Sequence, residues 1–184
     1  MTRNPLILAI FALTLALAGC GNRSIGNKLD DQFLAPKVIS QIQSAHADLT
    51  APTSHIVVTS YNGVILLCTG AVGEPGDDPR AQLRDLAEQS ARLVVGVKKV
   101  HNELQVQPPS SGLARSNDTL LTTKIKTRML ANSAVPASNI KVVTENGIVY
   151  LMGLVTREEA NQATELIQNV SGVQRIVRLF QYMD

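Results

Sequence analysis

Two cysteines and three histidines are the residues of this 184-residue chain best suited to covalent catalysis. A cysteine acts as a nucleophile when a nearby base removes its proton. In an internal repeat, described below, Cys68 corresponds to Met152, and none of the histidines recurs as a histidine. A methionine at the matching position indicates a buried apolar site for Cys68. We therefore expect no enzyme activity.

Paired carboxylates and a glycine-containing loop are the remaining candidates for a reactive or binding site. Glu158 and Glu159 fall in the first turn of an expected helix, where the helix dipole favours acids, and adjacent positions do not face each other. Gly73 and Gly76 have the spacing of a nucleic-acid-binding loop, but Glu74 between them would repel phosphate. The formal net charge of +2 is also small for a nucleic-acid binder. We expect no cofactor, no metal, no nucleic acid and no small-molecule substrate.

The first twenty residues indicate an export signal. Arg3 gives a short basic start, and the apolar run Pro5–Ala18 is shorter than the roughly 20 residues that a membrane-spanning helix needs. The run ends in Leu17-Ala18-Gly19-Cys20, which resembles the lipobox of bacterial lipoproteins. The resemblance implies that segment 1–19 is a signal peptide cut before Cys20. It also implies a diacylglyceryl thioether and an acylated amine on that cysteine.

Lipidation would fix both the location of the protein and its thiol chemistry. Two or more acyl chains hold a protein stably to a membrane. Gly21 follows Cys20 where an aspartate would be the alternative, which by resemblance to sorted lipoproteins implies the outer membrane, with the protein facing the periplasm. Cys68 then has no partner for an intramolecular disulfide. The competing interpretation is an ordinary signal peptide with a coincidental cysteine.

The rest of the sequence contains the same pattern twice. The segment "DDQFLAPKVISQI" matches "NDTLLTTKIKTRM" further along the chain. In the second copy, Leu121, Ile125 and Met129 recur at four-residue spacing, which predicts a helix. We expect Asp118 to be the N-cap of this helix and Pro36 to delay the start of its counterpart in the first copy.

Each copy continues with a hairpin, a second helix and a third strand. Asn62-Gly63 and Asn146-Gly147 each lie between two runs of apolar and β-branched residues, which is the strongest short signal for a β-hairpin. Thr156 and Glu159 have the spacing of a capping box, and Pro79 suits the first position of the corresponding helix. Each copy therefore predicts the order helix, strand, strand, helix, strand.

The order of these elements, the hairpin glycines and the Gly-Val opening of the last strand resemble the BON domain. The resemblance rests on "GVKKVHNEL" in the first copy and on these residues of the second: Val142, Gly147, Val149, Leu151, Gly153 and Val155. It implies an α+β fold of two tandem BON domains, each with a small three-stranded mixed sheet and two helices. The expected boundaries are 20–29 for a lipidated tether, 30–107 for the first domain, 108–116 for a linker and 117–184 for the second domain.

Each predicted sheet has two apolar faces. Alternation in the second hairpin puts Val149 and Leu151 on one face and Ile148, Tyr150 and Met152 on the other. The two helices of a domain can cover only one face. The other face then needs the second domain or a partner, unless it stays partly exposed without a function.

The helix that follows Asn117 carries the candidate lipid contact. If its apolar stripe faces the core, its outward residues are Leu120, Thr123, Lys124 and Thr127, with Lys126 and Arg128 on the flanks. An exposed leucine beside cations is typical of a contact with an anionic lipid surface. In the first copy, Lys37 matches Lys124, whereas the positions of Lys126 and Arg128 hold uncharged residues. The competing interpretation is a solvated helix face with one leucine.

Two functions fit these observations. The resemblance implies an outer-membrane lipoprotein, from a family that is regarded as phospholipid-binding. On this interpretation the protein binds anionic phospholipid membranes through the helix after Asn117 and supports envelope integrity. The alternative is a protein-interaction scaffold for outer-membrane assembly or cell-wall remodelling enzymes, with an envelope protein as partner.

Overall fold

The computed structural model describes residues 25–50, 54–72, 79–105 and 110–183. The predicted signal peptide, Cys20 and the Gly73–Gly76 loop lie outside these residues. Within the described residues, no helix combines the length and apolar character that crossing a bilayer requires.

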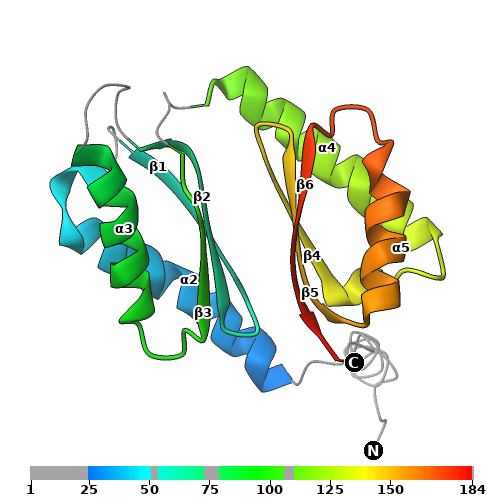
Figure 1. Ribbon diagram of the computed structural model, residues 1–184, viewed down its shortest axis with the longest axis horizontal. Helices are drawn as coiled ribbons and strands as arrows, with labels where there is room; N and C mark the ends of the chain where they lie inside the picture. Colours follow the sequence, from blue (N-terminus) through cyan, green and yellow to red (C-terminus); the bar gives the residue numbers. More distant parts are fainter. Residues whose placement is uncertain (1–24, 51–53, 73–78, 106–109, 184) are drawn as a thin grey trace, which may run out of the picture.

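Two domains of the same design follow each other along the chain (Figure 1). The first contains α2 (Ile25–Ala45), β1 (Ser54–Tyr61), β2 (Val64–Val72), α3 (Pro79–Arg92) and β3 (Lys99–Glu103). The second contains α4 (Gly112–Ala131), β4 (Ile140–Glu145), β5 (Ile148–Val155), α5 (Arg157–Gln168) and β6 (Arg175–Tyr182). Short 3-10 helices, η2 (Ala47–Leu49) and η3 (Ala137–Asn139), come before β1 and β4. This order confirms the predicted α+β fold.

Each domain forms one small mixed sheet. The strand orders are β1-β2-β3 and β4-β5-β6, with the hairpin strands antiparallel and the third strand parallel to the second. A parallel pair needs a crossover connection, which α3 and α5 provide. The α5 helix begins with the predicted capping box of Thr156 and Glu159, and α3 begins at Pro79 as expected.

Both hairpin turns have the backbone conformation that Asn-Gly predicts. The φ angles are 54° at Asn62 and 77° at Gly63, and 49° at Asn146 and 73° at Gly147. Two successive positive φ angles match the twist of the strands they join. A side chain at Gly147 would also meet the Cγ of Gln174 at 2.9 Å. The turn therefore requires the glycine, and any larger residue would also displace the Gln174 side chain.

The expected N-cap at Asp118 is wrong. The α4 helix begins at Gly112, inside the stretch predicted as a linker, and Ser111 is its cap, accepting a hydrogen bond from the Ala114 amide at 3.1 Å. Asp118 lies about 1.7 turns after Gly112 and is buried. Its carboxylate accepts hydrogen bonds from the amides of Asn146 at 2.8 Å and Gly147 at 2.9 Å. The carboxylate therefore holds the hairpin turn against the helix.

Asp31 has the same role in the first domain. Its carboxylate accepts from the amides of Asn62 at 2.6 Å and Gly63 at 3.0 Å, and from the Ser60 hydroxyl at 2.7 Å. Buried turn amides without an acceptor would be costly, so the repeated aspartate explains how both turns are buried under a helix. Asp31 and Asp118 match in the repeat, but the expected N-cap role names the wrong partner, since the carboxylates bind the hairpin turns and not the first amides of the helices.

Pro36 does not delay its helix, so that expectation is also wrong. The α2 helix runs from Ile25 to Ala45 with Pro36 inside it. Pro36 lies on the exposed side, where water can bind the carbonyl that lacks an amide partner. Leu34, Val38 and Ile42 are buried on the opposite side. Tertiary packing of this stripe thus outweighs the local cost of the proline.

The helices of each domain cover one face of its own sheet. In the second domain, the predicted stripe of Leu121, Ile125 and Met129 packs with Val149 and Leu151 of β5. In the first domain, the stripe of α2 packs with the matching β2 residues, Ile65 and Leu67. The alternation predicted for the second hairpin is confirmed, since these residues point to the helices.

The other faces of the two sheets pack against each other. A third apolar cluster combines residues of both domains: Tyr61, Val64, Leu66 and Cys68 from the first, and Tyr150, Met152 and Leu179 from the second. Hydrogen bonds surround it, from the Tyr61 hydroxyl to the Asn139 carbonyl at 2.6 Å and from Lys141 Nζ to the Ser60 carbonyl at 3.2 Å. The neighbour that the sequence left open is therefore the second domain.

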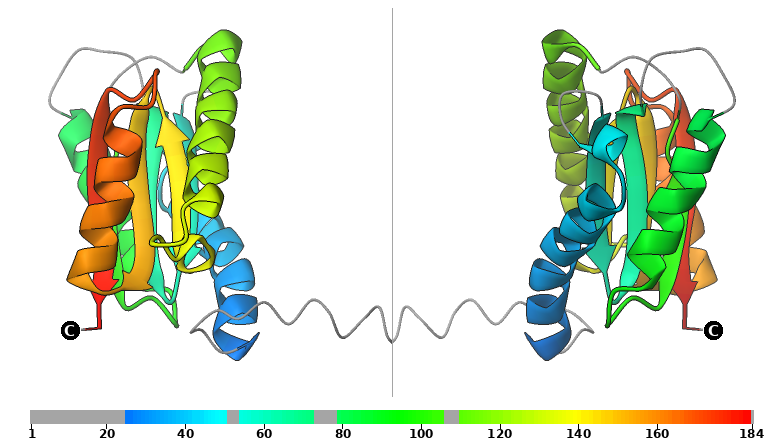
Figure 2. Two further views of the ribbon diagram at one scale, coloured as in Figure 1. Left: turned by 90° about the vertical axis from the view of Figure 1, so that its right-hand side faces the viewer. Right: turned by 90° about the vertical axis from the view of Figure 1, so that its left-hand side faces the viewer.

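The result is a four-layer arrangement with the helices outside and the two sheets at the centre (Figure 1). Figure 2 shows that α2 and α4, the first helices of the two domains, lie on one side of the paired sheets, whereas α3 and α5 lie on the other. The two copies of the predicted lipid-contact helix thus share one side of the molecule.

Candidate functional site

The outer face of α4 is open to solvent. All six residues predicted to contact lipid are exposed: Leu120, Thr123, Lys124, Lys126, Thr127 and Arg128. Leu120 is 61% exposed, and Leu113 and Leu130 on the same helix, at 73% and 76%, were missed in the sequence. Leu113 lies in the stretch predicted as a linker, which is why helical spacing was not applied to it. The helix thus presents three leucines among its cations.

Leu120 and Lys124 line a cavity of about 480 Å³ at the first half of α4. Its other walls come from the Asn146-Gly147 turn, which Asp118 holds in place, and from the loop before β6. Thr123, Thr127 and Arg128 do not line this cavity, and Lys126 lies at a separate hollow of about 210 Å³ beside Leu130. The structure therefore brings together two of the six predicted residues and spreads the rest along the helix.

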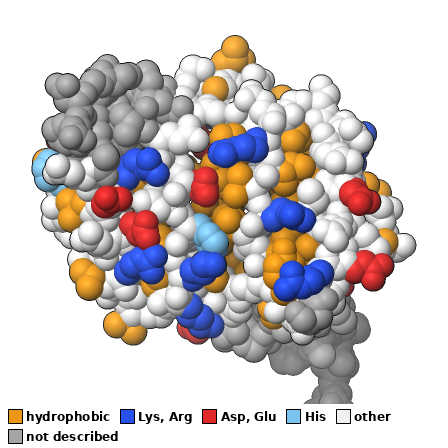
Figure 3. All heavy atoms as spheres, in the orientation of Figure 1, with side chains coloured by type: hydrophobic (Ala, Val, Ile, Leu, Met, Phe, Trp, Pro, Cys, Tyr) orange, Lys and Arg blue, Asp and Glu red, His pale blue; other side chains and the backbone are white. Residues whose placement is uncertain are grey.

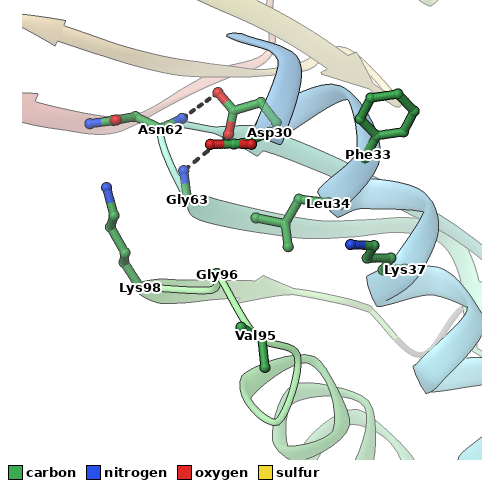
Figure 4. Close-up of a pocket in the computed structure, with 10 residues that line it drawn as sticks. Asp30, Phe33, Leu34, Lys37, Asn62, Gly63, Val95, Gly96 and Lys98 are labelled. Atoms are coloured by element: carbon green, nitrogen blue, oxygen red, sulfur yellow. Dashed lines mark hydrogen bonds between the residues drawn. The ribbon is translucent and has the colours of Figure 1, made fainter. Parts of the chain in front are cut away.

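The first domain has a matching cavity of about 540 Å³ (Figure 4). It lies between α2, the Asn62-Gly63 turn and the loop before β3. Phe33 and Lys37 take the places of Leu120 and Lys124 in the repeat, so the position of the site is common to both copies. Sequence reasoning missed this cavity, because its walls come from segments that only the fold brings together.

Comparison with known proteins agrees with this duplicated architecture. The sequence pattern of the BON domain matches residues 30–108 and 117–184. The chain belongs to the BON family. Its two BON domains correspond to the two copies of helix, strand, strand, helix, strand described above.

Several curated proteins are similar to this chain over most of its length. The chain is 33% identical to the outer membrane lipoprotein DolP of Haemophilus influenzae, over the whole length of both proteins. It is 34% identical to the 21 kDa hemolysin of Actinobacillus pleuropneumoniae, over 88% of this chain and 78% of the relative. It is 28% identical to osmotically-inducible protein Y of Escherichia coli, over 83% of this chain and 72% of the relative.

Figure 3 shows the opposite side of the BON pair from α2 and α4, the side on which β3 and β6 lie. Basic side chains there are scattered among acidic and hydrophobic ones. Lys99 and Arg175, at the starts of β3 and β6, are both exposed. The two residues are therefore suitable control positions for the charges of α4.

Among the described residues, no group of three or more histidine, cysteine, aspartate or glutamate side chains is placed to hold a metal ion.

Cys68 lies in the apolar cluster between the two BON domains and is fully buried. Its repeat counterpart, Met152, is in the same cluster, which confirms the predicted apolar site. Burial, with smaller effects from Glu145 and Glu103, raises the pKa of the Cys68 thiol to about 12. The thiol is therefore neutral at ordinary pH and shielded from water, which makes it a poor nucleophile in the folded protein.

We expect Cys68 to resist modification while the protein is folded. In a Cys20→Ala chain at pH 8, Ellman's reagent should leave the folded protein unmodified and react with one thiol per chain in denaturant, because only unfolding hydrates the sulfur and lowers its pKa. Absorbance of the released thiolate measures this. Full reaction under native conditions would contradict the shared apolar cluster.

Proposed function

We propose that this BON protein is an outer-membrane-anchored periplasmic lipoprotein that binds anionic phospholipids through α4 of its second domain and so supports envelope integrity. The relative from Haemophilus influenzae, which is named an outer membrane lipoprotein, supports the location because it aligns with the entire chain. Cys20 is the proposed acylation site, segment 1–19 the proposed signal peptide and 20–29 the proposed tether.

The composition of the exposed face of α4 is the observation that carries the lipid proposal. Leu120 is 61% exposed and lies on the same face of the helix as Lys124, about one turn before it. Among the described residues, Lys124, Lys126 and Arg128 form no ion pair, so their charges are available to a ligand. The leucine would enter the boundary between headgroups and acyl chains while the cations contact the headgroups.

The expected strength of this contact fits a tethered protein. Each basic residue near an anionic surface contributes about 1 kcal/mol, so three contribute roughly 3 kcal/mol. With the apolar contact of Leu120 added, a free chain binds anionic vesicles weakly and reversibly, which falls short of a stable anchor. The contact is enough to orient a domain that an acyl chain already holds at the surface, because tethering gives a high effective concentration.

We expect the double change Lys124→Glu with Arg128→Glu to abolish binding to anionic vesicles. The experiment uses the two-domain chain with Cys20→Ala, which lacks the proposed acylation site, and flotation with phosphatidylglycerol-containing vesicles. Reversing two charges replaces attraction with repulsion at the headgroups. The bound fraction should fall to background.

A matched control reverses two charges elsewhere. Lys99→Glu with Arg175→Glu makes the same change in net charge on the side of β3 and β6, away from α4. It should leave most of the binding intact. Equal losses of binding in the two double variants would mean that binding depends only on the net charge of the protein. The assignment of the lipid site to α4 would then be wrong. If the unchanged Cys20→Ala chain never floats with anionic vesicles, the lipid proposal fails and the scaffold function takes its place.

A further inference from the structure

The cavity of the first BON domain carries charges of both signs. Asp30 and Lys37 reach it from α2, and Lys98 reaches it from the loop before β3 (Figure 4). The Lys98 amide donates to the Gly63 carbonyl at 2.8 Å, and its side chain lies across Gly63, so the residue is fixed beside the hairpin turn. In Figure 4, Lys37 and Lys98 lie on opposite sides of Leu34.

These three charged side chains are available to a ligand. Within the described part of the chain, Asp30, Lys37 and Lys98 form no ion pair and no side-chain hydrogen bond. The neighbouring carboxylate of Asp31 differs, because it already accepts the turn amides of Asn62 and Gly63. The cavity thus offers two ammonium groups and one carboxylate that lack partners of their own.

The rim of the cavity is apolar. Phe33 is 62% exposed and Val95 is 94% exposed, and both line the cavity. Phe33 and Val95 therefore place apolar surface beside the unpaired charges at one cavity. A ligand with a charged head and an apolar body satisfies both parts of the site.

The matching cavity of the second domain has different chemistry. Asn117, Ser171 and Gln174 replace Asp30, Val95 and Lys98 at corresponding positions. The second cavity therefore keeps Lys124 but lacks the exposed carboxylate, the second lysine and the exposed valine. The two cavities are formed by the same elements of the fold but carry different charges, which suits them to different headgroups.

We propose that the first-domain cavity binds the zwitterionic phosphoethanolamine headgroup of a membrane phospholipid. Lys37 and Lys98 bind the phosphate, Asp30 accepts hydrogen bonds from the primary ammonium, and Phe33 and Val95 contact the boundary of the acyl chains. The volume of about 540 Å³ is within the ordinary range for small ligands. An exclusively anionic headgroup would meet repulsion from Asp30, and a choline group has no N–H to donate to it.

The position of the cavity relative to Cys20 favours a membrane lipid over a soluble molecule. Asp30 is ten residues after Cys20, and α2 already includes the last of these residues. Even with residues 20–25 fully extended, Asp30 lies at most roughly 25 Å from the acylated cysteine. The inference rests here on the proposed acylation, which would hold this cavity next to the headgroups.

The test compares vesicles that differ only in the headgroup amine. The Cys20→Ala chain is floated with phosphatidylcholine vesicles and with vesicles of equal parts phosphatidylcholine and phosphatidylethanolamine. We expect stronger binding to the second kind. Asp30→Asn and Lys98→Gln should each weaken the ethanolamine-dependent binding about five-fold. Both changes introduce residue types that the second domain carries at the matching positions, so both should fold.

Two further measurements separate this inference from the proposed function. Binding to phosphatidylglycerol vesicles should be unchanged by Asp30→Asn and Lys98→Gln, since that binding is assigned to α4. Soluble phosphoethanolamine should shift the amide NMR signals of Gly96 and Lys98 in the unchanged chain. In the Lys98→Gln variant, the Gly96 signal should not shift. No preference for ethanolamine over choline, or equal losses on both kinds of vesicle, would overturn the inference even if anionic binding through α4 holds.

Discussion

Tyr150→Ala is expected to uncouple the two BON domains. The Tyr150 side chain is only 2% exposed and lies in the cluster that both sheets share. Truncating a large buried aromatic side chain costs about 3–5 kcal/mol. Because the lost contacts are between domains, we expect the single thermal unfolding transition of the Cys20→Ala chain to shift downward and to split into two. Differential scanning calorimetry measures both effects.

Tyr182→Ala is the matched control for this prediction. Tyr182 is 39% exposed at the end of β6, where the Arg157 guanidinium lies 4.6 Å from its ring centre. Its loss should cost about 1 kcal/mol, which is typical of an exposed cation–π contact, and should leave one transition. If Tyr150→Ala and Tyr182→Ala unfold alike, the sheets are not packed as described.

Asp118→Ala should destabilise the second domain by about 3 kcal/mol. The change leaves the buried amides of Asn146 and Gly147 without their acceptor, and each unsatisfied amide costs about 1–3 kcal/mol. Urea unfolding followed by circular dichroism measures the loss. The same change should also weaken binding to anionic vesicles, because the turn forms one wall of the cavity beside Lys124.

Asp85→Ala provides the comparison for this second prediction. Asp85 is an exposed residue of α3, so its removal should change the free energy of unfolding by less than about 0.5 kcal/mol. Equal urea midpoints for the two variants would mean that the Asp118 carboxylate does not hold the turn.

Local signals predicted most of the fold. Asn-Gly between apolar runs fixed the hairpins because those two residues tolerate the positive φ angles that the turn requires. The capping box at Thr156 predicted the start of α5 for the same local reason. The start of α4 was harder, since the segment before Asn117 is rich in proline, serine and glycine and is typical of a linker. The serine cap and Gly112 are residue types that a linker also contains, so they did not distinguish the helix start from the linker.

Features that join distant segments could not be predicted from one copy of the pattern. The first-domain cavity combines α2, the turn at Gly63 and the loop at Gly96, and only folding brings these together. The alternation in β2 and β5 indicates that both faces of each sheet are covered, but periodicity does not identify the covering layer. The lipid-contact residues of α4 were placed correctly on its outer side, and their contact with lipid stays a prediction.

The shared face of the sheets also has a consequence for the order of folding. In synthesis and in the proposed export alike, the N-terminal part of the chain comes first, so the first domain is complete before β5 and β6 arrive. During that interval the side of β2 that carries Val64, Leu66 and Cys68 has no cover. The first domain alone is thus an aggregation-prone intermediate until the second domain covers it, and a chain truncated after β3 is expected to self-associate through this side.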